Sequence, residues 1–202
     1  METYSSDDET AEAVKKWWRE NGKSVIGGAV LGLSAVFGWQ WWQANVTQQG
    51  IEAAAIYDRM FNTLATDPAA ARVEADTLTG QYPSTPYAAL AELAIAKTMV
   101  EQGAGEEAAV HLRKAIELAK LPELVEVARL RLARLLADGG KHDEALAELA
   151  RVQGFTASGE EVRGDIHLAR GERDEAKAAY QRALDAGGNR STLSIKLDDL
   201  GG

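Results

Sequence analysis

Residues 140–152 read GKHDEALAELARV, and the same outline recurs as GAGEEAAVHLRKAI at 103–116 and GERDEAKAAYQRAL at 171–184. In each copy a Gly is followed five residues later by Ala, then by Leu or Tyr, and then by Ala or Val. A period of this length predicts a stack of similar units that share one continuous core. The positions expected to pack between helices are Ala108, Leu112, Ala115, Ala145, Leu149, Val152, Ala176, Tyr180 and Ala183.

Each copy has the signals of a sharp turn followed by a helix. The Gly permits the turn, and the acidic pair after it suits the positive end of a helix dipole. A small Ala is needed where two helix axes cross closely. Upstream of each Gly, apolar residues recur at helical spacing and predict a first helix in every unit. These upstream sets are Leu93-Ala96-Met99, Leu132-Ala133-Leu136 and Gly164-His167-Leu168.

The matched alanines lie 37 and 31 residues apart, around the 34-residue period of tetratricopeptide repeats. The units resemble that family in degenerate form, with irregular spacing and no tryptophan. One further helix pair without the signature is expected at 48–65 and 68–79. A short helix at 194–200 is expected to cover the last repeat, which ends at Gly187-Gly188. The predicted fold is therefore all-α, with a solenoid of degenerate tetratricopeptide-type helix pairs.

A different kind of segment precedes the repeats. Residues 24–42, SVIGGAVLGLSAVFGWQWW, carry no charge, and as a helix they would extend about 28 Å, close to the hydrocarbon thickness of a bilayer. A buried core helix rarely has aromatic residues gathered at both ends, whereas membrane helices often do. No small-residue cleavage pattern follows, so a retained membrane anchor is predicted. The interfacial aromatic residues are Trp17, Trp18, Trp39, Trp41 and Trp42.

Within the span, small residues recur at a spacing of about four. Ser24, Gly28 and Gly32, with Ala35 nearby, form a face of the GxxxG type. Such a face lets another membrane helix approach closely. It is the candidate contact for a partner helix, either from a second copy or from another protein.

The distribution of basic residues predicts the orientation. Lys15, Lys16, Arg19 and Lys23 precede the span, and the next basic residue is Arg59. By the positive-inside rule the N-terminus is cytoplasmic and the C-terminal part is exported, into the periplasm of a bacterium with two membranes. We therefore expect a cytoplasmic leader at 1–23, an inner-membrane signal anchor at 24–42 and a periplasmic repeat domain at 43–202.

The leader has two local signals. Ser6 and Glu9 fit a capping box that would open a short helix on the inner leaflet, although an unstructured leader fits equally well. Asn21-Gly22 would break that helix before the span begins.

Composition excludes several classes of function. A net charge of −9 without a basic stripe argues against nucleic acid, and the lack of cysteine excludes disulfides and thiolate chemistry. His111, His142 and His167 lie in different repeats without metal-ligand spacing. The carboxylate pairs 106–107, 143–144 and 174–175 recur at one repeat position, which predicts helix N-terminal caps rather than acid–base catalysis. We expect no enzymatic activity, no cofactor, no metal and no small-molecule substrate.

The first helices of such a solenoid form a concave wall suited to extended peptides or partner helices. Aligning the repeats places Lys97, Arg134 and Asp165 at one equivalent position on that wall, with Leu93 and Leu130 beside them. Stacked Lys and Arg could hold a carboxylate or a peptide carbonyl. The alternative is a solvated face that contacts nothing.

The order of these parts is more specific than any one of them. EAVKKWWRENGKS at 12–24, GWQWW at 38–42 and RGDIHLARGERDEA at 163–176 together resemble the YfgM-type ancillary subunit of the bacterial Sec translocon. The resemblance implies a single-span inner-membrane protein associated with the SecYEG channel and with a PpiD-type periplasmic chaperone. It would help to pass newly translocated chains to periplasmic folding factors, and its leader would influence an envelope-stress response regulator. A scaffold for a pilus or division complex, and a hydrolase with an unrecognised site, are the alternatives.

Overall fold

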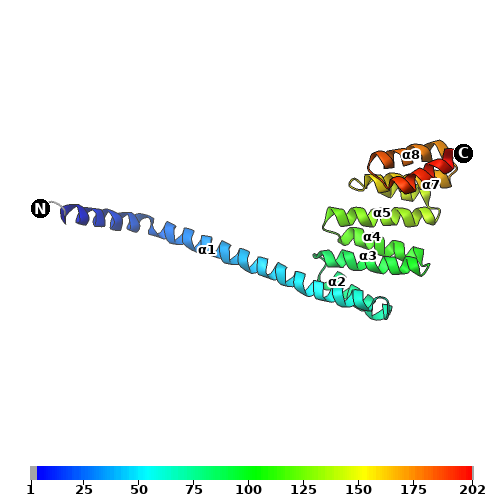
Figure 1. Cartoon of the computed structure of the whole chain (residues 1–202). Coiled ribbons are helices and arrows are strands. Elements are labelled where there is room, and N and C mark those ends of the chain that lie inside the picture. The colour runs from blue at the N-terminus through cyan, green and yellow to red at the C-terminus, as the bar shows by residue number, and fades with distance from the viewer. Residues whose placement is uncertain (1–3, 202) are drawn as a thin grey trace. The chain divides into compact units, whose positions relative to one another are not determined.

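The computed structural model describes residues 4–201, and in that range the chain is helical with no strand, as predicted. The chain divides into two units, Met1–Gln48 and Gln49–Gly202, which are described separately below. Figure 1 shows the helices in chain order. They are α1 (Tyr4–Thr63), α2 (Pro68–Gln81), α3 (Pro86–Glu101), α4 (Gly105–Leu118), α5 (Pro122–Asp138), α6 (His142–Leu149), α7 (Thr156–Ala169), α8 (Arg173–Asp185) and α9 (Arg190–Gly201).

Helix α1 is continuous, and the break expected at Asn21-Gly22 is wrong. The Asn21 side-chain amide donates a hydrogen bond to the Trp17 carbonyl oxygen at 3.1 Å, so it supports the helix. The Trp18 ring covers Gly22 and lies 3.3 Å from where a Cβ atom would stand. The helix already includes Tyr4, so the expected start at Ser6 is wrong as well, and the capping-box side chains lie outside the described residues.

The same helix contains the predicted anchor. Among the described residues, it is the one helix long and apolar enough to cross a membrane by length and composition. Its apolar side chains in the range 24–42 are exposed, including Leu31 at 73% and Phe37 at 66%. A helix with this much exposed apolar surface suits a lipid environment better than water. Helix α1 then continues beyond the predicted anchor to Thr63, where its last turns become the first helix of the repeat domain.

The repeat domain consists of the helix pairs that the sequence predicts. Helices α3 and α4, α5 and α6, and α7 and α8 pack as neighbours along the chain. Figure 1 shows α3 beside α4 and α7 beside α8. The turns within these pairs contain Gly103, Gly140 and Gly171 with φ of 77°, 74° and 78°. Only glycine adopts this left-handed backbone without a steric penalty, which explains the Gly at the start of each copy.

Two groups of buried residues form the main core. The first joins the end of α1 with α2, α3 and the start of α4 around Met60, Leu78 and Ile95. The second extends from α3 to α7 around Leu112, Leu132 and Ile166. Helix α9 covers the end of the stack, where Leu193 is fully buried against α8. It is longer than the expected 194–200 and has the covering role predicted for a terminal helix.

Candidate protein-binding surface

A cavity of about 280 Å³ lies on the first-helix side of the repeats, between α3, α4 and α5. Its apolar lining includes Leu93, Ala96, Leu112 and Leu135. Its charged residues are three cations and two acids. These are Lys97, Arg131, Arg134, Glu101 and Asp138. An apolar floor with a few charged groups at the rim is the usual composition of a peptide-binding groove.

Two of the cations around this cavity have no protein partner. Arg131 and Arg134 are exposed on α5, three residues apart, and neither makes a hydrogen bond or ion pair with any residue that the structure describes. Several other arginines of the domain form ion pairs, among them Arg113, Arg151 and Arg163. Arg129, on the same helix, bonds Glu148 at 2.6 Å. Lys97 is paired only loosely with Glu101, at 3.6 Å. The cavity therefore has unneutralised positive charge beside apolar side chains, in a chain whose net charge is −9.

The structure brings together only part of the predicted groove. Leu93, Lys97 and Arg134 line this cavity. Leu130 is 7% exposed and belongs to the core between helices. Asp165 does not line the cavity. Arg131 also lines the cavity, although it does not align with Lys97, Arg134 and Asp165 in the repeats and was not predicted. Its position three residues before Arg134, on the same helix, was the signal that could have found it.

Asp165 instead belongs to a polar cluster that holds the last helix in place. It accepts a hydrogen bond from the Tyr180 hydroxyl at 2.7 Å. The Lys196 ammonium of α9 bonds both of its oxygens at 2.7 and 3.0 Å and also bonds Glu161 at 2.9 Å. The same ammonium lies over the Tyr180 ring. Lys196 of α9 thus neutralises Asp165 of the third repeat, whereas Arg134, at the equivalent position of the second repeat, has no ion pair with the residues that the structure describes.

Two pKa values shift in this cluster. Burial, supported by the hydrogen bond to Asp165, raises the pKa of Tyr180 above its ordinary value. Burial alone would lower the pKa of Lys196, but the hydrogen bonds and charges of Asp165 and Glu161 outweigh it and raise that pKa. Both shifts favour the protonated groups that hold α9 against α7 and α8.

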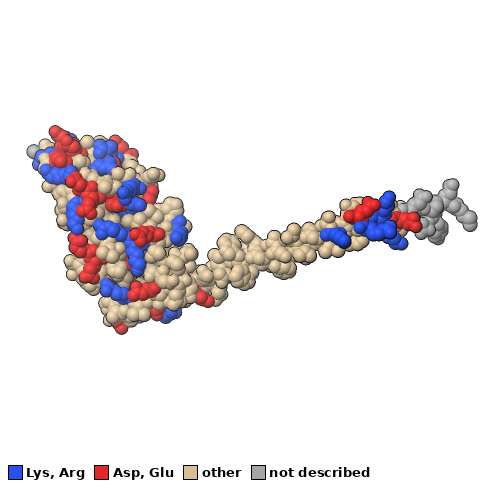
Figure 2. Space-filling model, turned by 180° about the vertical axis from the view of Figure 1, so that it is seen from behind, with Lys and Arg blue, Asp and Glu red and all other residues tan. Residues whose placement is uncertain are grey.

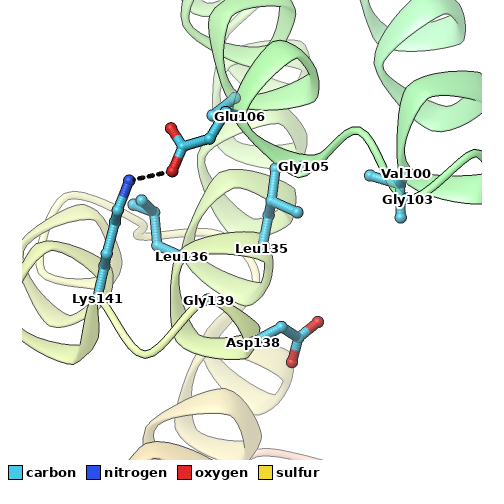
Figure 3. Close-up of a pocket in the computed structure, with 10 residues that line it drawn as sticks. Val100, Gly103, Gly105, Glu106, Leu135, Leu136, Asp138, Gly139 and Lys141 are labelled. Carbon is cyan, nitrogen blue, oxygen red and sulfur yellow. Dashed lines mark hydrogen bonds and ion pairs between the residues drawn. The ribbon is translucent and has the colours of Figure 1, made fainter.

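The acidic residues at the helix starts connect successive repeats. Glu106 and Glu107 lie in the first turn of α4, where they complement the helix dipole, but the prediction that they cap the helix is wrong, because neither side chain bonds a backbone N–H group there. Lys141 of the next repeat bonds Glu106 at 2.5 Å, as Figure 3 shows, and this contact holds the pKa of Glu106 below its usual value. Asp143 forms the equivalent ion pair with Arg170. Glu106 and Asp143 therefore form ion pairs between successive repeats. A second cavity of about 410 Å³ lies at this edge.

The predicted repeat-packing positions lie in the core with one exception. Val152 is only half-buried and lies beyond α6, which ends at Leu149. The buried positions are Ala108, Leu112, Ala115, Ala145, Leu149, Ala176, Tyr180 and Ala183.

Two of the histidines, His111 and His167, lie within hydrogen-bond distance of a carboxylate. His111 Nδ1 lies 2.6 Å from the Glu92 carboxylate, which is 2% exposed and also bonds Lys114 at 2.6 Å. His167 Nδ1 lies 2.6 Å from Glu172. Within residues 4–201, no group of three His, Asp or Glu side chains could hold a metal ion.

The predicted membrane features are all exposed on α1. The small-residue face of Ser24, Gly28, Gly32 and Ala35 is exposed, and a Cβ atom on Gly28 or Gly32 would meet nothing within 4 Å. This leaves room for another helix. The aromatic residues are 51–73% exposed and comprise Trp17, Trp18, Trp39, Trp41 and Trp42.

The matches to known proteins extend over both the apolar N-terminal segment and the repeat domain. A family model described as a tetratricopeptide repeat-like domain matches residues 15–202. A protein of Haemophilus influenzae named ancillary SecYEG translocon subunit is 31% identical over 98% of this chain and 99% of its own length. Proteins with the same name from Aggregatibacter actinomycetemcomitans and Escherichia coli are 31% and 28% identical, over 96% and 91% of this chain and 97% and 90% of theirs. With its membrane helix and repeat domain both covered, the chain belongs to the family of ancillary SecYEG translocon subunits.

Proposed function

We propose that this protein is an inner-membrane ancillary subunit of the SecYEG translocon, anchored by residues 24–42, with residues 43–202 as an interaction domain in the periplasm. The observation that carries the proposal is the similarity to proteins of that name over 98% of the chain, anchor included. A tetratricopeptide-like domain suits a role in protein binding.

The proposed topology rests on the basic residues before the anchor. Lys15, Lys16, Arg19 and Lys23 hold the leader, residues 1–23, in the cytoplasm. A reporter that fluoresces only in the cytoplasm, fused after Gly202, should stay dark in cells. The same reporter fused to the N-terminus should fluoresce. Fluorescence of the C-terminal fusion would contradict the topology.

The cavity between α3, α4 and α5 is the proposed binding surface of the repeat domain. Its unpaired Arg131 and Arg134 favour a partner with a carboxylate, and its apolar lining favours an aliphatic side chain next to that carboxylate. We propose that a periplasmic chaperone of the PpiD type binds here. The subunit would then bring that chaperone close to chains leaving the channel and help to hand them over.

Photocrosslinking in cells tests the surface directly. A photoreactive amino acid in place of Lys97, whose side chain is 73% exposed beside the cavity, should crosslink to the chaperone. The same amino acid in place of Val110, 59% exposed on the second helix of that repeat, is the matched control and should not. Equal crosslinking from both positions, or none from Lys97, would remove the cavity from the proposal.

The small-residue face of α1 is the proposed contact with a membrane partner. Gly28→Leu and Gly32→Leu would fill the space that a second helix needs, whereas Val30→Leu leaves this face unchanged. We expect the glycine variants to reduce recovery of the channel subunits and the Val30 variant to leave it unchanged. Unchanged recovery in all three would place the contact elsewhere.

A further inference from the structure

The first part of α1 has a strongly basic side. At about 100° per residue, the side chains of Lys15, Lys16, Arg19 and Lys23 fall within an arc of about 100° on one side of the helix, with Glu12 as the one acidic residue of residues 12–23 in that arc. Figure 2 shows Lys and Arg side chains in blue gathered toward this end of the helix, with acidic side chains in red beside them. Trp17 and Trp18 fall outside that arc, toward the opposite side of the helix. Because α1 has no break at Asn21-Gly22, this basic stripe continues directly into the apolar segment.

None of these cations is neutralised within the described part of the chain. Glu12 and Glu20 are neighbours on the same helix, yet neither forms an ion pair with the four cations. Lys15, Lys16 and Arg19 instead line, together with the Glu12 carboxylate, a shallow hollow of about 430 Å³ on the helix surface, where the cations outnumber the acid by three to one. Free cations around a hollow can accept an anionic group of small size, such as a phosphate.

The position of the stripe along the helix indicates where that phosphate would be. Lys15 to Lys23 cover about 12 Å of helix directly before the uncharged segment. If residues 24–42 span the bilayer, this stretch lies at the depth of the lipid headgroups. The other end of the span has three tryptophans, Trp39, Trp41 and Trp42, and no basic residue before Arg59. The two ends therefore share aromatic residues and differ in charge.

We infer that the stripe of Lys15, Lys16, Arg19 and Lys23 binds the headgroup phosphates of anionic phospholipids and collects these lipids around the cytoplasmic end of the anchor. The inference rests on the proposed membrane span and adds a lipid preference to it. Clusters of four or more basic residues next to a membrane helix attract anionic lipids, with a contribution from each cation. At the opposite end no cluster of basic residues attracts anionic headgroups, so the lipids there should have the composition of the whole bilayer.

The chain carries its own reporters for this test, because all five tryptophans lie in α1. The full-length protein is reconstituted in nanodiscs of phosphatidylcholine and phosphatidylglycerol. Either one lipid or the other is brominated near the headgroup, so that it quenches nearby tryptophan fluorescence. Replacing Trp39, Trp41 and Trp42 by Phe leaves reporters only at the basic end. Replacing Trp17 and Trp18 by Phe leaves reporters only at the other end, as an internal control.

We expect brominated phosphatidylglycerol to quench Trp17 and Trp18 on the order of twofold more than brominated phosphatidylcholine at equal mole fraction. The preference should fall toward onefold in 0.5 M salt and in a variant with Lys15, Lys16, Arg19 and Lys23 all replaced by Gln. The reporters at the other end should show a ratio near one.

Equal quenching by the two lipids at Trp17 and Trp18 would overturn the inference. So would the same preference at both ends, or a preference that survives the four Gln replacements. Failure of the span itself gives a different result: neither brominated lipid would quench Trp39, Trp41 and Trp42, and the proposed anchor would then be wrong together with the lipid site.

Discussion

The ring of Tyr180 occupies the space above Gly164, where a Cβ atom would come within 2.3 Å of the Tyr180 Cε1 atom. The two residues come from the first and second helices of the third repeat. The same sequence positions hold Ala96 with Leu112 in the first repeat and Ala133 with Leu149 in the second. The third repeat therefore combines a larger side chain on one helix with a smaller residue on the other.

This size relationship predicts that Gly164→Ala destabilises the last repeat. The ring of Tyr180 is fully buried and cannot move into solvent, so the new methyl group would push α7 and α8 apart. Overpacking of this kind costs about 1–3 kcal/mol, partly offset by the better helix propensity of alanine. Hydrogen–deuterium exchange of the full-length protein in detergent should show faster exchange in α7 and α8 than in α3 and α4.

A second substitution makes the test specific. Tyr180→Leu in the Gly164→Ala background recreates the Ala–Leu combination of the other repeats and should restore part of the slow exchange, since it relieves the overpacking but removes the hydroxyl that bonds Asp165. Tyr180→Leu alone should open a cavity above Gly164 and destabilise the repeat. If the loss of stability in the double variant equalled the sum of the losses in the two single variants, the two residues would not be coupled.

The turn glycines give a prediction about backbone conformation. Gly140→Ala places an L-residue at φ of 74° and should cost about 1–2 kcal/mol. Gly80→Ala is the matched control, because Gly80 lies within α2 and a Cβ atom there would meet nothing within 4 Å. That substitution should be neutral or stabilising by up to about 1 kcal/mol. Thermal unfolding followed by circular dichroism should separate the two variants, and equal midpoints would contradict the conformational argument.

The cluster of Tyr180, Asp165 and Lys196 predicts a pH dependence at the alkaline end. Both raised pKa values mean that the folded state holds these protons more tightly than the unfolded state. Their contribution to stability is therefore complete below the unfolded values of about 10 and is lost as pH rises through the folded values. The melting temperature of the wild type should exceed that of Lys196→Gln at pH 8.

The same difference should shrink at pH 11, since Lys196 begins to lose its proton and the attraction to Asp165 and Glu161 weakens. Lys177→Gln serves as the control, because Lys177 is exposed on α8 and is not part of the cluster. A Lys196→Gln deficit that is as large at pH 11 as at pH 8 would show that the ammonium does not hold α9 through its charge.

The proposed groove predicts the effect of removing its free charges. Arg131→Gln and Arg134→Gln should each weaken retention of the chaperone about tenfold, as expected for loss of a charge-assisted hydrogen bond to a carboxylate. Lys120→Gln removes one exposed cation that does not line the cavity and should change little. Retention is measured by titrating the immobilised full-length protein with purified chaperone. If the two arginine variants bound the chaperone with the same affinity as Lys120→Gln, a carboxylate contact at this cavity would be excluded.

The features predicted correctly from the sequence are those that depend on one residue type. A left-handed turn needs glycine, so Gly103, Gly140 and Gly171 marked the turns. A close helix crossing needs a small residue, so the alanines five residues later marked the packing positions. These requirements are local and leave a visible trace in the sequence at each repeat.

The features that were missed depend on neighbours that the sequence does not display. Asn21-Gly22 is a breaking signal in isolation, but Trp17 and Trp18 support the helix there through a hydrogen bond and a ring contact. Asp165 aligns with Lys97 and Arg134, yet a lysine of the terminal helix 31 residues further along the chain neutralises it. Contacts of that range require the three-dimensional structure.

Co-purification tests the central claim most directly. Membranes are solubilised in a mild detergent, the protein is recovered through a tag at its N-terminus, and the associated proteins are identified by mass spectrometry. The account predicts recovery of SecYEG subunits together with a membrane-anchored periplasmic isomerase-type chaperone. Recovery of the protein alone, or of pilus or division proteins without the channel, would contradict it.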